Sequence, residues 1–313
     1  MRIGRAAGFT DTGRRRLRNE DAFICEPPLF AVADGMGGAR AGEVAARLAA
    51  GALEERAGTE TRGEEGLTAL IVEANRRIWE RALTDPTTAG MGTTVTAALV
   101  DAEQGTVAIG HVGDSRAYLL RDGVLEQLTT DHSLVAELVE SGLLTPEEAE
   151  RHPQRSAITR ALGTEPTVEV ETFTVSGQEG DLFLICSDGV TVMLSDEDLA
   201  AALETAERDP EAGAEAVVAA ANARGGEDNI TVVLFELAEG EPPAVEPPRV
   251  EQDLPVPEVA APDLVGDSVP EADDPEADLR RHGAGPGGRS AALALITTVL
   301  VVGALALYWG ISR

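Results

Sequence analysis

The feature of this sequence that most constrains its fold is a recurring pattern in which a short apolar run meets a carboxylate. One Asp-Gly pair after a strand is an ordinary turn, but here five apolar runs begin or end in this way. The acidic residues at these points are Glu20 with Asp21, then Asp34, Asp114, Asp188 and Asp228. Because short apolar runs bounded by Gly and Asp are typical of buried strands, we expect these carboxylates to converge at strand ends.

Such a set of oxygen ligands predicts a divalent cation. The stretch Asp34-Gly35-Met36-Gly37-Gly38 could cradle a phosphate, hold a cation or form a tight turn. It lacks the Gly-Lys-Ser/Thr ending of a phosphate loop and the spacing of a dinucleotide fingerprint. Carboxylates suit Mg²⁺ or Mn²⁺, and a glycine lets a backbone carbonyl approach the ion. The set contains no imidazole or sulfur that would suggest zinc.

Composition excludes one class of partner. The chain has 55 Asp+Glu against 25 Lys+Arg, all of them arginine, and a net charge of −30. We therefore expect no nucleic acid partner, because such binding depends on neutralising phosphates.

Cys25 and Cys186 lie in apolar runs and are expected to be reduced core thiols. The N-terminus lacks the apolar run of a signal peptide, so the bulk of the chain is expected in the cytosol.

Three regions follow one another along the chain. Residues 1–238 alternate between strand-like and helical runs and are expected to form one globular domain. Residues 239–289 are predicted to be a disordered linker, since positions 239–279 hold nine prolines, thirteen acids and one arginine.

The third region is a predicted transmembrane helix at residues 290–311. Positions 291–311 contain no charge, and a helix of ~20 apolar residues spans the hydrocarbon core of a bilayer. Tyr308 and Trp309 are suited to the membrane interface. More arginines precede this span than follow it, which predicts a single-pass protein of the cell membrane with its globular domain in the cytoplasm.

Apolar patterning locates the elements of the globular region. Strands are expected at 6–12, 22–25, 29–33, 94–101, 106–112, 116–121, 168–174, 181–186 and 230–237. Helices are expected at 41–56, 66–82, 132–141, 145–151, 196–206 and 211–224. Strands at both ends of the region, with helices between them, indicate helices packed on sheets in a layered sandwich.

Six motifs in this order resemble those of the PPM family, the metal-dependent type-2C protein serine/threonine phosphatases. They are Asn19-Glu20-Asp21, Asp34-Gly35-Met36-Gly37-Gly38, Gly90-Met91-Gly92-Thr93-Thr94, Gly113-Asp114-Ser115-Arg116, Ser187-Asp188-Gly189 and Asp228-Asn229. The resemblance covers residues 5–237 and is greatest to bacterial members that act with receptor-like Ser/Thr kinases. It implies an α+β fold, a four-layer α-β-β-α sandwich of two antiparallel sheets flanked by helices.

The resemblance also implies a centre with two Mn²⁺ or Mg²⁺ ions and a third, weaker site. Asp34 would bridge the two ions, the carbonyl of Gly35 would bind one, and Asp188 and Asp228 would bind the other. Glu20 and Asp21 would hold metal-bound waters. The third site would involve Asp114 with Asp188, and Ser156 in the segment 152–156 would lie near it.

Two further assignments concern substrate and proton. Arg16 matches the arginine that grips the substrate phosphate, although Arg14, Arg15 and Arg18 lie close in the chain. Met36 stands where some members have a histidine proposed as general acid, and a thioether cannot donate a proton. Either water at the metals or another residue would do so; His111 and His132 are candidates, but His111 fits a strand core and His132 a helix cap.

The functional expectation is hydrolysis of phosphoserine and phosphothreonine in proteins by a metal-bridged water, reversing a membrane Ser/Thr kinase. Residues 129–162 would form a flap over the cleft, whose acids could repel acidic phosphopeptides or merely face solvent. Two alternatives remain. The chain could be a catalytically silent module that binds phosphoproteins, or a phosphatase for a small molecule or a regulatory protein.

Overall fold

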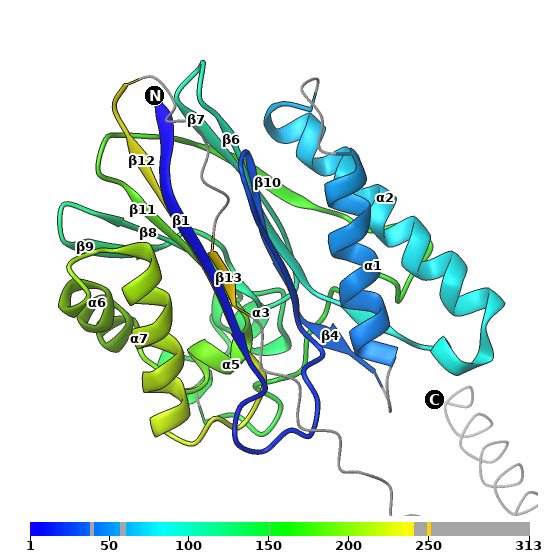
Figure 1. Cartoon of the computed structure of the whole chain (residues 1–313). Coiled ribbons are helices and arrows are strands. Elements are labelled where there is room, and N and C mark those ends of the chain that lie inside the picture. Colours follow the sequence, from blue (N-terminus) through cyan, green and yellow to red (C-terminus); the bar gives the residue numbers. More distant parts are fainter. Residues whose placement is uncertain (38–40, 57–60, 150, 241–248, 252–313) are drawn as a thin grey trace, which may run out of the picture. The chain divides into compact units, whose positions relative to one another are not determined.

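Two β-sheets lie face to face, and each is covered on its outer side by helices (Figure 1). This computed structural model describes residues 1–37, 41–56, 61–149, 151–240 and 249–251. The six-stranded sheet has the order β13-β1-β12-β11-β8-β9, and the five-stranded sheet has the order β10-β7-β6-β3-β2. All pairings within both sheets are antiparallel except that of β13 with β1.

The bounds of the strands are as follows. The six-stranded sheet consists of β1 (Arg2–Asp11), β8 (Arg116–Arg121), β9 (Val124–Gln127), β11 (Leu182–Cys186), β12 (Ile230–Ala238) and β13 (Arg249–Glu251). The five-stranded sheet consists of β2 (Ala22–Glu26), β3 (Leu29–Ala33), β6 (Val95–Asp101), β7 (Thr106–Val112) and β10 (Glu171–Ser176). A separate two-stranded pair joins β4 (Gly35–Met36) to β5 (Gly92–Thr93).

The helices form the two outer layers. The pair α1 (Ala41–Arg56) and α2 (Gly63–Thr84) covers the five-stranded sheet, and α6 (Asp196–Thr205) with α7 (Pro210–Ala223) covers the six-stranded sheet (Figure 1). Shorter helices are η1 (Pro86–Thr88), α3 (Leu134–Glu140), α4 (Pro146–Ala149) and α5 (Asp188–Thr191). On α1 the buried alanines at 45, 46, 49 and 52 leave room for close packing against its neighbours.

The layer between the two sheets is centred on stacked phenylalanines. Phe30 of β3 and Phe235 of β12 have ring centroids 4.1 Å apart, and Phe183 of β11 lies 4.9 Å from Phe235. All three are fully or almost fully buried. Because Phe30 belongs to one sheet and the other two rings to its partner, this stack fixes how closely the sheets approach.

Most expected elements are found, with shifted ends. The first strand begins at Arg2 rather than at residue 6, since Arg2 and Ile3 already pair with the end of β12. The last strand of the five-stranded sheet spans Glu171–Ser176 instead of 168–174. Ser133 and not His132 caps α3, because its hydroxyl accepts a hydrogen bond from the N–H of Ala136.

The short elements β4, β5 and η1 were not expected, and neither were three others. Strand β9 follows a two-residue turn at Asp122-Gly123, where both φ angles are positive, as a tight hairpin requires. Helix α5 begins at Asp188 itself. Strand β13 lies within the segment predicted as a disordered linker and pairs with the edge of β1.

The predicted transmembrane helix is not among the residues that the structure describes. Among the described residues, no helix combines the length and the apolar character needed to cross a bilayer. The span predicted at 290–311, and most of the predicted linker, lie outside the described residues.

Replacing Phe235 with alanine should lower the free energy of unfolding by about 3–5 kcal/mol, because it removes the ring that contacts both Phe30 and Phe183. Urea unfolding followed by circular dichroism measures the loss. Leu83→Ala is the matched control, since Leu83 is 67% exposed and should change stability by less than about 0.5 kcal/mol. Equal effects of the two substitutions would show that the ring stack is not central to the core.

Candidate metal and phosphate site

The carboxylates predicted to converge are electrostatic neighbours. Asp34 follows β3, Asp188 follows β11, and Asp228 precedes β12, so both sheets contribute. Asp34 and Asp188 lie close enough for each to act on the pKa of the other. Asp21 and Asp114 also act on the pKa of Asp34. Among the described residues, no three of these side chains meet closely enough to form a metal-ligand set by themselves.

Two threonines of the segment 90–94 hold the backbone at Asp34. The N–H of Asp34 donates to Thr94 Oγ1 over 3.1 Å, and the carbonyl of Asp34 accepts from the N–H of Thr94 (2.9 Å) and from Thr93 Oγ1 (2.8 Å). Thr94 Oγ1 lies 2.7 Å from Ser115 Oγ, beside Asp114. Three motifs that are far apart in the sequence are therefore joined by hydrogen bonds.

Glycine is required at two positions because the backbone approaches so closely there. A Cβ added to Gly35 would collide with the carbonyl oxygens of Gly42 and Glu20. A Cβ added to Gly189 would collide with the carbonyl oxygen of Asn229. Any side chain at these positions would push apart the segments that carry Glu20, Asp188 and Asp228.

Asp21 has one satisfied oxygen and one free oxygen. Its Oδ2 accepts hydrogen bonds from Ser187 Oγ at 2.9 Å and from Thr231 Oγ1 at 2.6 Å. Its Oδ1 is buried and has no hydrogen-bond partner. A buried, unpaired carboxylate oxygen is costly, and it suits a bound cation or its water.

Asn229 connects the loop between β1 and β2 to the start of β12. Its Nδ2 donates to the carbonyls of Thr12 (3.0 Å) and Arg18 (2.8 Å), and its Oδ1 accepts from the N–H of Glu20 (2.9 Å). Its own N–H donates to Asp228 Oδ1 at 2.8 Å. One amide side chain thus positions both Glu20 and Asp228.

The pKa values show why these residues fit divalent cations. Burial, together with nearby Asp188, raises the pKa of Asp21 to about 7, and the same two causes raise the pKa of Asp114 to about 7. Burial followed by neighbouring carboxylates raises the pKa of Asp34 and of Asp188. Carboxyl groups crowded in this way are neutralised either by protons or by cations. The free oxygen of Asp21 and the all-oxygen donor set favour Mg²⁺ or Mn²⁺.

Arg16 is the arginine closest to these ligands. Its Nη2 lies 2.6 Å from Asp228 Oδ2, and both side chains are partly exposed. Arg16 is therefore held at the edge of the carboxylate cluster, with solvent access on its other side. Among the described residues, Arg14 and Arg15 have no ion pair with a member of the cluster.

The two histidines considered as proton donors are engaged elsewhere. His111 is fully buried, with Nδ1 2.8 Å from Thr96 Oγ1 and Nε2 3.1 Å from the carbonyl of Thr130. His132 stacks on His111, accepts the N–H of Gly113 at Nδ1 (3.1 Å), and places Nε2 3.2 Å from Glu171. His132 binds the backbone of Gly113, next to Asp114. His111 is a core residue, because it is fully buried.

Ser156 lies in the predicted flap, residues 129–162. It is exposed in the segment between α4 and β10, and no hydrogen bond joins it to Asp114 or Asp188 among the described contacts. The base of this flap is fixed by backbone bonds of Leu134 to Ala157 and of Thr159 to His132. The assignment of Ser156 to a third metal site stays a prediction.

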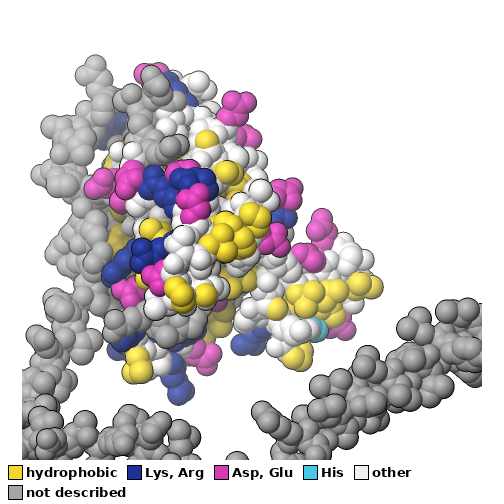
Figure 2. Space-filling view, turned by 90° about the vertical axis from the view of Figure 1, so that its right-hand side faces the viewer, with side chains coloured by type: hydrophobic (Ala, Val, Ile, Leu, Met, Phe, Trp, Pro, Cys, Tyr) yellow, Lys and Arg dark blue, Asp and Glu magenta, His cyan; other side chains and the backbone are white. Residues whose placement is uncertain are grey.

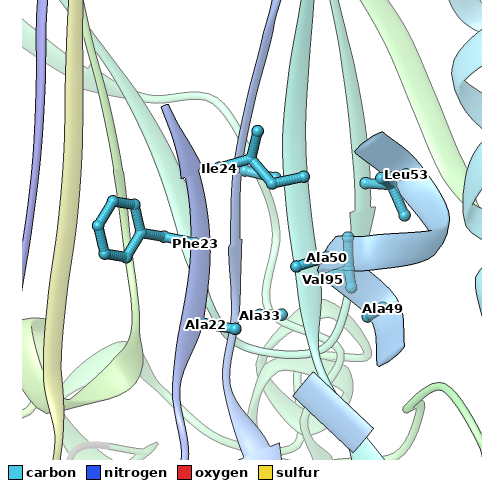
Figure 3. A pocket seen from close by; sticks show the side chains of 9 residues that line it. Ala22, Phe23, Ile24, Ala33, Ala49, Ala50, Leu53 and Val95 are labelled. Atoms are coloured by element: carbon cyan, nitrogen blue, oxygen red, sulfur yellow. The ribbon is translucent and has the colours of Figure 1, made fainter. Parts of the chain in front are cut away.

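An apolar recess lies between helix α1 and the strands β2, β3 and β6. It is lined by side chains of α1 and of strands β2, β3 and β6, which in Figure 3 are all hydrocarbon: Ala22, Phe23, Ile24, Ala31, Ala33, Ala49, Ala50, Leu53 and Val95. With no polar group in its lining, it cannot orient a phosphate or an ion. The carboxylate cluster is therefore the candidate functional site.

The supporting side chains were missed by sequence reasoning. Thr94, Ser187, Asn229 and Thr231 all lie beside predicted ligands or within their motifs. Their hydrogen bonds cross between strands that are far apart in the chain, so local patterning could not assign them. Asn229 was the easiest of the four to predict as a site residue, because it directly follows the predicted ligand Asp228 in the sequence.

Comparisons with known proteins agree on one family. A model of the protein phosphatase 2C family matches residues 13–219. The serine/threonine phosphatase stp of Listeria monocytogenes serovar 1/2a is 44% identical over 239 residues, which are 72% of this chain and 93% of the relative. The serine/threonine protein phosphatase PstP of Mycobacterium tuberculosis is 40% identical over 240 residues, 75% of this chain and 45% of that protein.

Solved structures lead to the same family. The crystal structure of the Mycobacterium tuberculosis phosphatase PstP/Ppp superposes with a TM-score of 0.72 at 40% identity, covering 76% of this chain and 100% of that one. A catalytic domain of PstP in complex with two manganese ions gives a TM-score of 0.69 at 37% identity, covering 76% of this chain and 99% of the other.

Without divalent cations, residues 1–240 should become less stable as the pH rises from 5.5 to 8. The pKa of Asp21 is raised in the fold, from 3.8 to about 7, so its contribution to stability is present at low pH and is lost as the pH rises through 7. Asp21→Asn removes this titration while keeping the acceptor for Ser187 and Thr231. The variant should therefore lose less stability than the unmodified domain, with a difference of up to about 1.4 kcal/mol per pH unit.

Thermal unfolding in EDTA at several pH values measures this difference. Asp122→Asn, at an exposed turn, serves as the control of equal charge change. The same pH dependence in all three proteins would show that Asp21 does not titrate in this range.

Proposed function

Because the chain belongs to the protein phosphatase 2C family, whose model matches residues 13–219, we propose that its carboxylate cluster binds divalent cations and hydrolyses phosphoserine and phosphothreonine in proteins. Relatives at 40–44% identity are named serine/threonine phosphatases, and the chain is a protein serine/threonine phosphatase. The observation that carries the proposal for the site is that Asp21, Asp34 and Asp188 are buried electrostatic neighbours, and that Oδ1 of Asp21 is buried without a hydrogen-bond partner.

The ligand roles divide among the described residues. Asp34, the carbonyl of Gly35, Asp188 and Asp228 would hold two ions, with Glu20 and Asp21 acting through waters. Asp114 with Asp188 would form a third site, which Ser156 could reach from the flap. When bound, the ions would supply a water nucleophile at neutral pH and balance the charge of the reacting phosphate. A related catalytic domain holds two manganese ions, which supports this division.

Arg16 would bind the substrate phosphate. Its guanidinium already lies 2.6 Å from Asp228 Oδ2, so a phosphate near Asp228 is within its reach. The guanidinium fork matches two phosphate oxygens and stays charged at any working pH. Arg16 would thus orient the phosphate and offset negative charge that develops during transfer.

Neither Met36 nor the two candidate histidines is placed to protonate the leaving group. Met36 cannot donate a proton, and the rings of His111 and His132 are engaged by Thr96, Gly113 and Glu171. We infer that the proton comes from water in the site.

In the cell, the substrates would be phosphorylated proteins, among them a receptor-like Ser/Thr kinase of the same membrane. The uncharged span at 290–311 and the acidic linker at 239–289 support a tethered enzyme with a cytoplasmic domain. A flexible tether would raise the effective concentration of the enzyme on membrane-bound substrates.

Activity should require the cations and the cluster. With residues 1–238, turnover of p-nitrophenyl phosphate and of a phosphothreonine peptide should disappear in EDTA, return with Mn²⁺, and be lost in Asp188→Asn, whereas Asp122→Asn should keep it. Turnover of metabolite phosphates but not of phosphopeptides would favour the small-molecule alternative. Binding of phosphopeptide without any turnover by folded protein would favour a silent binding module.

Arg16→Gln should lower kcat/KM for the phosphopeptide by about 10- to 100-fold, the cost of losing one charged hydrogen-bond pair. Arg16→Lys should recover part of it, because a lysine keeps the charge but not the fork. Steady-state kinetics of these variants beside Arg14→Gln make the test. If Arg14→Gln loses as much as Arg16→Gln, the phosphate is not held by Arg16 in particular.

A further inference from the structure

The loop between β1 and β2 carries an exposed cluster of arginines around one leucine. Its members are Arg14, Arg15, Arg16, Leu17 and Arg18, and we call these five residues the arginine loop. All five side chains are exposed, and Leu17 is 95% exposed. A single exposed leucine is common on a protein surface, so what distinguishes this loop is the group of four like charges around Leu17.

Arginines elsewhere are mostly neutralised. On α2, Arg76, Arg77 and Arg81 each form an ion pair with an acidic residue of the same helix or its end. Figure 2 shows a face of the molecule where dark blue side chains lie beside magenta ones. Among the described residues, by contrast, Arg14, Arg15 and Arg18 form no ion pair, although the chain has 55 acids for 25 basic residues. Arg18 is only close enough to Glu20 to act on its pKa.

The arginine loop is anchored beside the candidate site at both of its ends. The N–H of Arg14 donates to the carbonyl of Gly226 at 2.7 Å, and the carbonyl of Arg18 accepts from Asn229 Nδ2 at 2.8 Å. Between these anchors Arg16 reaches Asp228. The unpaired cations of Arg15 and Arg18 therefore flank, in the chain, the residue proposed to bind the phosphate.

We propose that Arg15, Leu17 and Arg18 form a docking surface for acidic groups next to the phosphorylated residue of a protein substrate. The inference rests on the proposed function, because a phosphate held by Arg16 would carry the adjoining peptide across this loop. Carboxylates and a second phosphate are both bound well by a guanidinium. Leu17 adds one apolar contact beside them.

A membrane surface is a weaker match for the same features. A lipid headgroup layer on the arginine loop would also cover the exposed side of Arg16, which is proposed to bind the substrate phosphate next to Asp228. One leucine also gives little apolar area for insertion into a bilayer. The position of the loop thus favours a peptide, and membrane binding becomes an outcome of the test.

The test uses the full chain, purified in mild detergent, and three phosphothreonine peptides of equal length. One has Asp and Glu beside the phosphothreonine, one has Asn and Gln there, and one has a second phosphothreonine. The acidic peptide should have a kcat/KM roughly 3- to 10-fold above that of the neutral peptide, as expected for one or two exposed ion pairs. The preference should reside in KM and should fade in 0.5 M NaCl, since exposed pairs are screened.

Arg15→Gln/Arg18→Gln should abolish this preference while leaving turnover of p-nitrophenyl phosphate within about two-fold, because neither side chain touches the reacting phosphate. Leu17→Ser should weaken binding of all three peptides alike. Arg76→Gln/Arg81→Gln removes the same charge from α2 and should keep the preference. Both double variants remove two positive charges, so both change the long-range repulsion between the acidic chain and the acidic peptide in the same direction. The difference between the two variants therefore measures the local effect of the arginine loop. The doubly phosphorylated peptide shows whether carboxylate or phosphate is preferred.

Several results would overturn the proposal: no preference in the unmodified chain, a preference that survives in Arg15→Gln/Arg18→Gln, or equal loss in the α2 control. Binding to phosphatidylserine vesicles that depends on Arg15 and Arg18, without a peptide preference, would assign the loop to membranes instead. If p-nitrophenyl phosphate is never turned over, the proposed function fails. Fluorescence anisotropy of labelled peptides in EDTA then decides the docking preference alone.

Discussion

The rest of the structure depends on the crowding of carboxylates at strand ends that belong to two different sheets. Burial and mutual repulsion raise the pKa of Asp34 and Asp188, so the fold holds groups together that would otherwise separate. Asp34 comes from the five-stranded sheet, whereas Asp188 and Asp228 come from the six-stranded one. The phenylalanine stack sets the distance between those sheets, and core packing therefore also sets the spacing of the site.

Neutral side chains hold this cluster in place. Thr94 fixes the backbone of Asp34, Ser187 and Thr231 occupy one oxygen of Asp21, and Asn229 joins Glu20 to Asp228. These partners orient the carboxylates without neutralising them, which leaves oxygens available to cations. In the described part of the chain, Arg16 forms an ion pair with the predicted ligand Asp228, and it does so from the exposed side, where a phosphate would arrive.

Sequence reasoning predicted most of the strands, the outer helix pairs and the convergence of the carboxylates, because each follows from a local pattern. It could not place Asn229 or Thr231 in the site, since their bonds join segments more than 200 residues apart. It missed β9, although the Asp122-Gly123 turn was visible, because the strand is only four residues long. It also missed β13, which pairs with the open edge of β1 and has no apolar pattern of its own in the sequence. The family resemblance supplied the metal roles, which geometry alone does not assign.

The pairing of β1 with β12 has a consequence for biosynthesis. The first strand emerges from the ribosome long before Ile230–Ala238 exists, so it must wait for its partner. Arg2 and Arg5 interrupt the apolar character of this strand, and charges placed in this way disfavour association between unpaired strands. In the finished sheet the same two arginines bind the carbonyl of Glu239 and the side chain of Glu236, so residues that protect the waiting strand also close the domain.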